Sequence, residues 1–261
     1  MGSRPVVLVT GAARRVGRAI ALDLAAHGFD VAVHFRGSHS EAQATAEDAR
    51  RLGARAETFG ADLADEAAAR ALVPAVVARF ERLDAVVNNA SSFDYDDVAG
   101  FSYTMLEHMV RANAAPAIVL AQALAAHLKG GTETGCVVNL LDQKLWNPNP
   151  DYLSYTMSKA ALEAATTMLA MALAPQVRVC GVAPGITLLS GPMDDGEFAR
   201  AHKLTPLQRS STPEDIARSV RFLIESPAIT GTTLLVDGGQ HLAGQPRDVM
   251  FLARQPAPSK D

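Results

Sequence analysis

Short apolar runs alternate along the chain with longer stretches in which apolar residues recur every three or four positions. The run Val6–Val9 predicts a buried strand, and the stretch that begins at Val16 predicts a helix that stops at Gly28. Further strands are predicted at 30–35, 56–59, 84–88, 136–140, 177–182 and 232–236, and further helices at 40–52, 65–82, 113–128, 152–174 and 212–225. This alternation predicts one α/β domain over 1–261, a doubly wound parallel sheet of about seven strands with helices on both faces.

Two of the predicted helices, 113–128 and 152–174, have too few polar positions for an exposed surface. We expect both to bury apolar faces against symmetry mates as well as in the core, which predicts a homotetramer. The segment 186–211 has little periodicity and is rich in Gly, Pro and Asp, which predicts a loop with a short helix that forms a substrate lid. The tail 254–261 is predicted to be poorly ordered or held by a partner.

Composition narrows the classes of partner. A formal net charge of −4 and a pI near 6.0 argue against nucleic-acid or membrane partners, because both demand a basic face. We see no apolar run of the roughly 20 residues that span a bilayer and no signal peptide, so we expect a cytoplasmic protein. Cys136 and Cys180 lie in apolar runs and are predicted to be buried free thiols. The histidines show no metal-ligand spacing, so no metal site is predicted.

The first predicted strand passes into the first helix through a turn that contains Gly11 and Gly17. Gly11 permits a tight turn, and Gly17 lets the helix lie close to the strand. The free N–H groups at the start of a helix can hold a pyrophosphate, which predicts a dinucleotide site. An ordinary connection between strand and helix would need the same glycines, and Arg15 departs from the usual G-x-G-x-x-G pattern.

The end of the second predicted strand bears on the choice of dinucleotide. Proteins that use NAD generally place an acidic residue there to bind the ribose hydroxyls, whereas this strand ends in His34-Phe35-Arg36-Gly37-Ser38. Arg36 suits a 2′-phosphate, and Ser38 and His34 offer further hydrogen bonds. We therefore predict NADPH, the alternative being that Arg36 is a solvated loop residue.

Tyr155 and Lys159 stand four residues apart on the long helix 152–174 and therefore share one face. A lysine charge beside a tyrosine favours the phenolate and lowers the tyrosine pKa, so the pair predicts a proton donor. The alternative is an interfacial tyrosine with a solvated lysine.

Over nearly its whole length the chain resembles the short-chain dehydrogenase/reductase family. The matching positions are Thr10-Gly11, Gly17, Asp62-Leu63, Asn88-Asn89-Ala90, Asn113, Tyr155 with Lys159, Pro184-Gly185 and Asp237-Gly238-Gly239. The resemblance implies a Rossmann-type fold in which Tyr155 donates the proton, Lys159 holds the nicotinamide ribose and Asn113 helps to build a water relay. It also implies that the cofactor contacts Gly11, Arg15, Val16, Gly17, Asp62, Leu63, Asn89, Ala90, Ser91, Pro184, Gly185 and Thr187.

One position departs from that family. Asp142 stands thirteen residues before Tyr155, where most members carry a serine. Together with Arg15 and the run Asn89-Ala90-Ser91-Ser92-Phe93, it makes the chain similar to pteridine reductases and bacterial dihydromonapterin reductases. That similarity implies that Phe93 stacks on the pterin ring and that Ser91, Arg15 and Leu189 belong to the substrate pocket. It also implies that Asp142 passes a proton to Tyr155.

These roles have alternatives within the sequence. Asp142 could pair with Lys144, Phe93 could anchor a loop, and Trp146 could line the pocket or pack its own loop. The expected activity is NADPH-dependent reduction of a pteridine, dihydropterin to tetrahydropterin, with dihydrofolate and oxidised pterin as further candidates. A reductase of carbonyl groups in thioesters, sugars or steroids and a non-catalytic NADPH-binding regulator are the alternatives. The particular pterin stays open.

Overall fold

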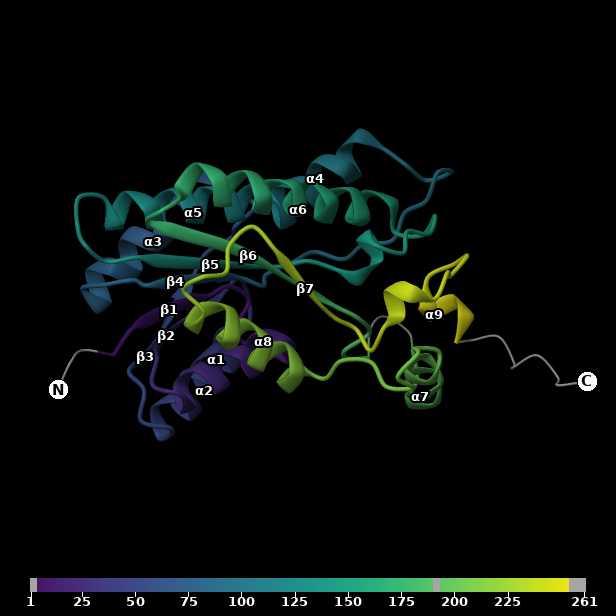
Figure 1. Cartoon of the computed structure of the whole chain (residues 1–261), viewed down its shortest axis with the longest axis horizontal. Coiled ribbons are helices and arrows are strands. Elements are labelled where there is room, and N and C mark those ends of the chain that lie inside the picture. The colour runs from purple at the N-terminus through teal and green to yellow at the C-terminus, as the bar shows by residue number, and fades with distance from the viewer. Residues whose placement is uncertain (1–3, 190–192, 254–261) are drawn as a thin grey trace, which may run out of the picture.

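The computed structural model describes residues 4–189 and 193–253, and the predicted tail 254–261 lies outside them. A seven-stranded sheet runs through the molecule in the order β3-β2-β1-β4-β5-β6-β7, with every neighbouring pair parallel. Its strands are β1 Val6–Val9, β2 Asp30–Phe35, β3 Ala56–Gly60, β4 Ala85–Asn88, β5 Gly135–Leu140, β6 Val177–Pro184 and β7 Thr233–Val236. The predicted doubly wound fold is confirmed (Figure 1).

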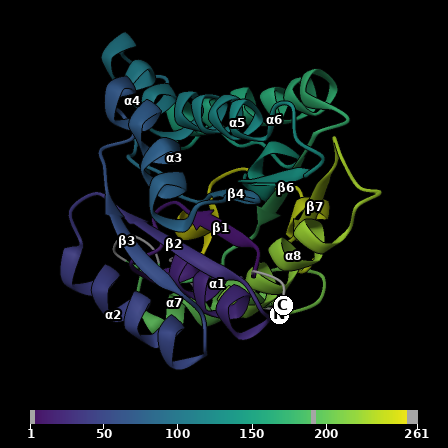
Figure 2. The ribbon, with the colours of Figure 1, turned by 90° about the vertical axis from the view of Figure 1, so that its left-hand side faces the viewer.

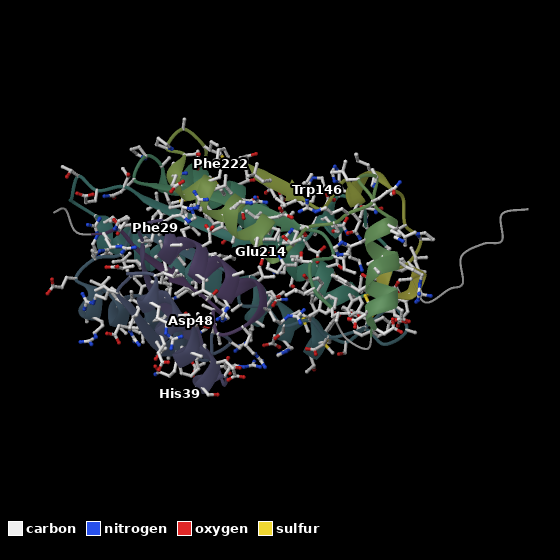
Figure 3. All side chains as sticks on the ribbon, turned by 90° about the horizontal axis from the view of Figure 1, so that it is seen from below. Phe29, His39, Asp48, Trp146, Glu214 and Phe222 are labelled. Carbon is white, nitrogen blue, oxygen red and sulfur yellow. The ribbon has the colours of Figure 1, made fainter. Side chains whose placement is uncertain are left out.

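Helices cover both faces of the sheet, as Figure 2 shows. One layer holds α1 Arg15–Ala26, α2 His39–Arg51 and α8 Pro213–Glu225, and the other holds α3 Glu66–Phe80, α5 Ala115–Leu128 and α6 Leu153–Leu173. Successive side chains of β1 point to opposite faces of the sheet. Val7 and Val9 pack against the first helix layer, and Val6 and Leu8 pack against the second. His39 and Glu214 lie exposed on the outer side of the first layer (Figure 3).

Local signals placed most helix ends correctly. Thr212 caps α8 through a capping box with Asp215, and Pro213 occupies its first turn.

Cys136 and Cys180 are buried free thiols in β5 and β6, as predicted. Burial raises the pKa of Cys136 to about 12, so its reactive thiolate form is suppressed.

The structure corrects the sequence reading between β4 and β5. Helix α4, Tyr103–Asn113, was not predicted: its apolar positions Met105, Leu106, Met109 and Val110 form only a short stripe, and only Met109 and Asn113 of its residues are buried. Asn113 ends α4 and does not begin the next helix. The following helix, α5, starts at Ala115, with Pro116 in its first turn, where the missing N–H costs no hydrogen bond.

These two helices also bear on the membrane prediction. The stretch Tyr103–Leu128, which spans α4 and α5, is long and apolar enough to cross a membrane by length and composition, with a hydropathy of 1.3. The expectation that no apolar run is long enough is therefore wrong. Leu120, Ala121 and Leu124 of α5 pack in the core against β4 and β5, so core packing accounts for the apolar character of α5.

The winding direction reverses at the centre of the sheet, which positions the functional site. From β1 the chain proceeds to β2 and β3 on one side, and from β4 to β5, β6 and β7 on the other. Ligands of open α/β sheets bind in the crevice that such a reversal leaves at the carboxyl ends of the strands. Thr10 Oγ1 closes the base of this crevice by accepting hydrogen bonds from Asn89 N at 2.9 Å and Ala90 N at 3.0 Å.

Candidate active site

The turn between β1 and α1 is built for close backbone approach. Gly11 has a φ of +62°, and a Cβ on Gly17 would lie 2.3 Å from the carbonyl oxygen of Gly11. Asn89 Nδ2 donates to the carbonyls of Thr10 at 2.9 Å and Gly11 at 3.2 Å, which fixes the turn. Only glycine therefore fits at position 17, and the N-terminus of α1 faces an open crevice.

The crevice above this turn has a volume of about 540 Å³. Its walls include all the following predicted cofactor residues: Gly11, Arg15, Val16, Gly17, His34, Arg36, Ser38, Asp62, Leu63, Asn89, Ala90 and Ser91. The walls contain three arginine side chains but only one carboxylate, that of Asp62. The Oδ1 of Asp62 accepts a hydrogen bond from Ala64 N at 3.0 Å. Arg36 forms no ion pair within residues 4–189 and 193–253. This lining suits a dinucleotide that carries an additional phosphate.

His34 has a different role from the one predicted. Its Nδ1 accepts a hydrogen bond from Gly11 N at 3.1 Å, and its Nε2 lies 3.1 Å from the carbonyl oxygen of Ala61. Burial lowers the pKa of His34 to about 4, so the ring is neutral at physiological pH. The ring ties β2 to the glycine turn and to the end of β3, and bonding a phosphate would break one of these contacts.

The predicted catalytic residues meet where β5 ends and α6 begins. Tyr155 Oη donates to Asp142 Oδ2 at 2.9 Å. Asp142 Oδ1 accepts from the backbone N–H of Lys144 at 2.9 Å and so caps the short helix Gln143–Leu145. The Lys144 ammonium itself bonds the Asp151 carbonyl at 2.6 Å and Asp248 at 3.2 Å. The alternative in which the Lys144 side chain pairs with Asp142 is therefore wrong.

Burial dominates the electrostatics of this group. It raises the pKa of Asp142 above its usual value, against the opposing effect of the Lys144 backbone N–H. Burial and the neighbouring Asp142 raise the pKa of Tyr155 well above 10, whereas burial lowers the pKa of Lys159 to about 8. The net lowering of the Tyr155 pKa expected from Lys159 is therefore not found, because burial and the adjacent Asp142 dominate; Lys159 Nζ lies 5.8 Å from the ring centroid of Tyr155.

A second cavity of about 310 Å³ adjoins the first, with Arg15, Val16 and Ser91 in the walls of both. Asp142, Tyr155 and Phe93, predicted for catalysis and substrate binding, also line it, together with Gly185 and Thr187, predicted for cofactor binding. Phe93 is 40% exposed; its ring stacks on that of Tyr152 at 4.2 Å and meets the edge of Tyr155 at 4.6 Å. It therefore presents ring surface to the cavity as well as anchoring a loop. Trp146 does not line this cavity.

Four predicted site residues, Asn113, Lys159, Pro184 and Leu189, line neither cavity. Asn113 is buried behind the wall, where its Oδ1 accepts from Ser92 N at 2.7 Å and its Nδ2 donates to Ser158 Oγ at 2.9 Å. Lys159 Nζ donates to the Leu140 carbonyl at 2.8 Å. The Leu189 carbonyl accepts from Arg15 at 2.8 Å, which joins the segment after β6 to the glycine turn.

The predicted lid, 186–211, contains the short helix α7, Asp195–Lys203, as expected, and closure over a ligand stays a prediction. Sequence reasoning missed a wall formed by the segment after β7. Gln240, Gln245, Asp248, Val249 and Met250 line the second cavity, and α9, Val249–Leu252, lies beside α7 (Figure 1). A bidentate bond from Arg247 to the buried Asp151 docks this segment. No motif or periodicity marks it, because its place depends on pairing across 96 residues.

Known proteins match this chain over most of its length. The family model described as Enoyl-(Acyl carrier protein) reductase matches residues 11–241. The crystal structure of FolM Alternative dihydrofolate reductase 1 from Brucella suis in complex with NADP superposes with a TM-score of 0.89 at 40% identity, covering 95% of this chain and 99% of that one. Pteridine reductase 1 from Leishmania tarentolae is 35% identical over 91% of this chain and 96% of its own length. The 3-oxoacyl-(acyl-carrier-protein) reductase FabG from Staphylococcus aureus (strain Mu50) is 30% identical over 90% and 97%.

Proposed function

This chain belongs to the short-chain dehydrogenase/reductase family, and from that premise we propose that it is an NADPH-dependent reductase of pteridines. The observation that carries the proposal is the 2.9 Å bond between Tyr155 and Asp142 at the wall of the second cavity. A buried carboxyl group beside the proton donor serves proton relay, whereas an ionised carboxylate cannot donate to a substrate carbonyl. Similarity to the FolM protein and to pteridine reductase 1 supports the same substrate class.

Bound NADPH supplies the hydride that reduces a carbon–nitrogen double bond of the ring. Tyr155 gives its Oη proton to the ring nitrogen next to the reduced carbon, and the phenolate regains a proton from Asp142 at 2.9 Å. The raised pKa of Asp142 lets it carry that proton at a higher pH than an ordinary aspartate. The charge of Lys159 favours the transient phenolate, and its ammonium has donors beyond the one used by Leu140 for the ribose hydroxyls.

The second cavity would hold the ring between Phe93 and the nicotinamide, since Phe93 presents part of its ring there. Arg15 and Ser91 line both cavities and are placed to bond the ring or the cofactor phosphates. The Leu189 carbonyl would hold Arg15 in that position. Pro184 ends β6, Gly185 and Thr187 follow it, and all three would support the nicotinamide.

Carbonyl reduction is the second candidate, because a 3-oxoacyl-(acyl-carrier-protein) reductase is among the relatives. Purified protein with NADPH should be assayed in parallel against a dihydropterin, dihydrofolate, an acetoacetyl thioester and a simple ketone. We expect turnover of the dihydropterin. Turnover of the carbonyl compounds alone would replace the proposal with the second candidate. NADPH binding without turnover of any compound would indicate a non-catalytic regulator.

Cofactor choice provides the next prediction. Charge-assisted hydrogen bonds contribute roughly 1.5 to 3 kcal/mol each, so a single bond from Arg36 to the 2′-phosphate favours NADPH by about tenfold or more. Arg36→Ala should lower kcat/KM with NADPH by that factor and leave the value with NADH unchanged. Arg51→Ala, at the far end of α2, is the matched control and should change neither value. An equal or better kcat/KM with NADH in the parent protein would contradict the prediction.

We also propose a homotetramer. The side chains of Met168 and Met171 on α6 are 68% and 78% exposed, an unusual position for apolar groups on the helix that carries Tyr155 and Lys159. A second copy packed on α5 and α6 would bury them. Light scattering at micromolar concentration should give about four times the 27.5 kDa chain mass. A monomeric mass would contradict the proposal.

A cytoplasmic location stays a prediction.

A further inference from the structure

One buried amide in the second cavity has no role in the chemistry described so far. Gln143 follows Asp142 directly, lies in the short helix Gln143–Leu145 and is 6% exposed. It lines the second cavity but not the first. Its Oε1 is shielded from solvent and has no hydrogen-bond partner among the residues that the structure describes, so the amide must turn about its terminal bond for this oxygen to meet a ligand in the cavity. Burying such a group without a partner costs free energy, so native proteins seldom do it without a reason.

The two other glutamines of this cavity show the usual arrangement. Gln240 Oε1 accepts from Ile186 N at 3.2 Å, and Gln240 Nε2 donates to Gln245 Oε1 at 3.4 Å. Both oxygens of Asp142 are also engaged, by Tyr155 and by the Lys144 backbone. Gln143 is therefore the polar side chain of this wall that is left with an unmatched oxygen, next to the group that delivers the proton.

We propose that the side-chain amide of Gln143 binds the substrate, through a ring edge on which an N–H group lies beside a hydrogen-bond acceptor. A primary amide presents an acceptor oxygen next to a donor nitrogen, and a cyclic amide or amidine is its geometric complement. The proposal rests on the proposed function, because a pteridine ring carries such edges. A simple ketone or a thioester offers the carbonyl acceptor only and would leave Oε1 unmatched. Gln143 thus determines specificity for the ring and takes no part in proton transfer.

The test compares two measurements, the KM for the substrate and the unfolding temperature, because the proposal predicts a higher KM without a lower Tm. Gln143→Leu replaces the amide by an apolar group of similar size, so it should raise the KM for 6-methyl-7,8-dihydropterin by about tenfold or more while kcat changes much less. The same variant should unfold at the same or a higher temperature than the parent, because it removes an unmatched buried polar group. A glutamine with a structural role would give a lower Tm. Gln143→Asn, which keeps the amide on a shorter stem, should recover part of the affinity.

The control is Gln43→Leu, on α2, whose amide bonds Thr58 and lies away from the second cavity. It should leave the KM unchanged. An unchanged KM in Gln143→Leu, with the parent active on the dihydropterin, would overturn this inference alone. A rise in the Kd for NADPH that matches the rise in KM would also overturn it, since the amide would then bind the nicotinamide. A parent protein with no dihydropterin turnover would remove the proposed function and this inference together.

Discussion

Tyr155→Phe should lower kcat for dihydropterin reduction by about a hundredfold to ten-thousandfold, the usual contribution of a positioned acid, and leave the Kd for NADPH unchanged. The variant removes the Oη proton and keeps the ring, which meets Phe93 edge-on at 4.6 Å. The proton held by Tyr155 is tightly bound, because burial and Asp142 raise its pKa well above 10. It can leave only when hydride transfer makes the neighbouring ring nitrogen strongly basic, so the effect should fall on kcat.

The matched control for this variant is Tyr103→Phe, the same chemical change at a tyrosine that is 85% exposed at the start of α4. It should retain the activity of the parent. Steady-state kinetics and NADPH titration of both variants decide the matter. Full turnover by Tyr155→Phe would show that the proton comes from elsewhere, and Asp142 would be the first residue to test.

Asp142→Asn should have the second largest effect. The amide keeps an oxygen that can accept from the Lys144 N–H but cannot resupply Tyr155, so kcat should fall by about ten- to a hundredfold while NADPH affinity is retained. Asp142→Ser should likewise cost pteridine turnover far more than cofactor affinity. In the parent, Asp142 must be protonated to act, so kcat should fall as pH rises through its raised pKa. This dependence should disappear in Asp142→Asn.

The pH dependence of kcat distinguishes a catalytic role of Asp142 from its role as a helix cap. Asp65→Asn changes another aspartate that caps a helix, α3, through a bond to Ala67 N at 2.8 Å, and it lines neither cavity. It should leave both kcat and its pH dependence intact. If Asp142→Asn kept full pteridine activity, or lost activity without losing the pH dependence, the relay would be wrong and Asp142 would be a loop residue.

The sequence predicts an element correctly where the element's own residues carry a hydrophobic period or a capping residue. The seven strands, the cap at Thr212 and the shared face of Tyr155 and Lys159 each leave a pattern within a few consecutive residues, so the sequence predicts them. Helix α4 was missed because its apolar stripe covers only positions 105–110 and few of its residues are buried. The position of Asp142 relative to Tyr155 could be inferred only because the resemblance aligned it with a known catalytic position.

The sequence by itself therefore determined the architecture, the glycine turn after β1 and the shared helix face of Tyr155 and Lys159, since these depend on short-range spacing and residue chemistry. Only the tertiary structure decided how these groups behave. It placed His34 between two backbone groups, reversed the expected direction of the Tyr155 pKa and brought the segment after β7 against the second cavity. It also showed that Gln143 is buried without a partner. Desolvation and hydrogen bonding depend on what surrounds a side chain in space, and those neighbours come from parts of the chain that no local pattern connects.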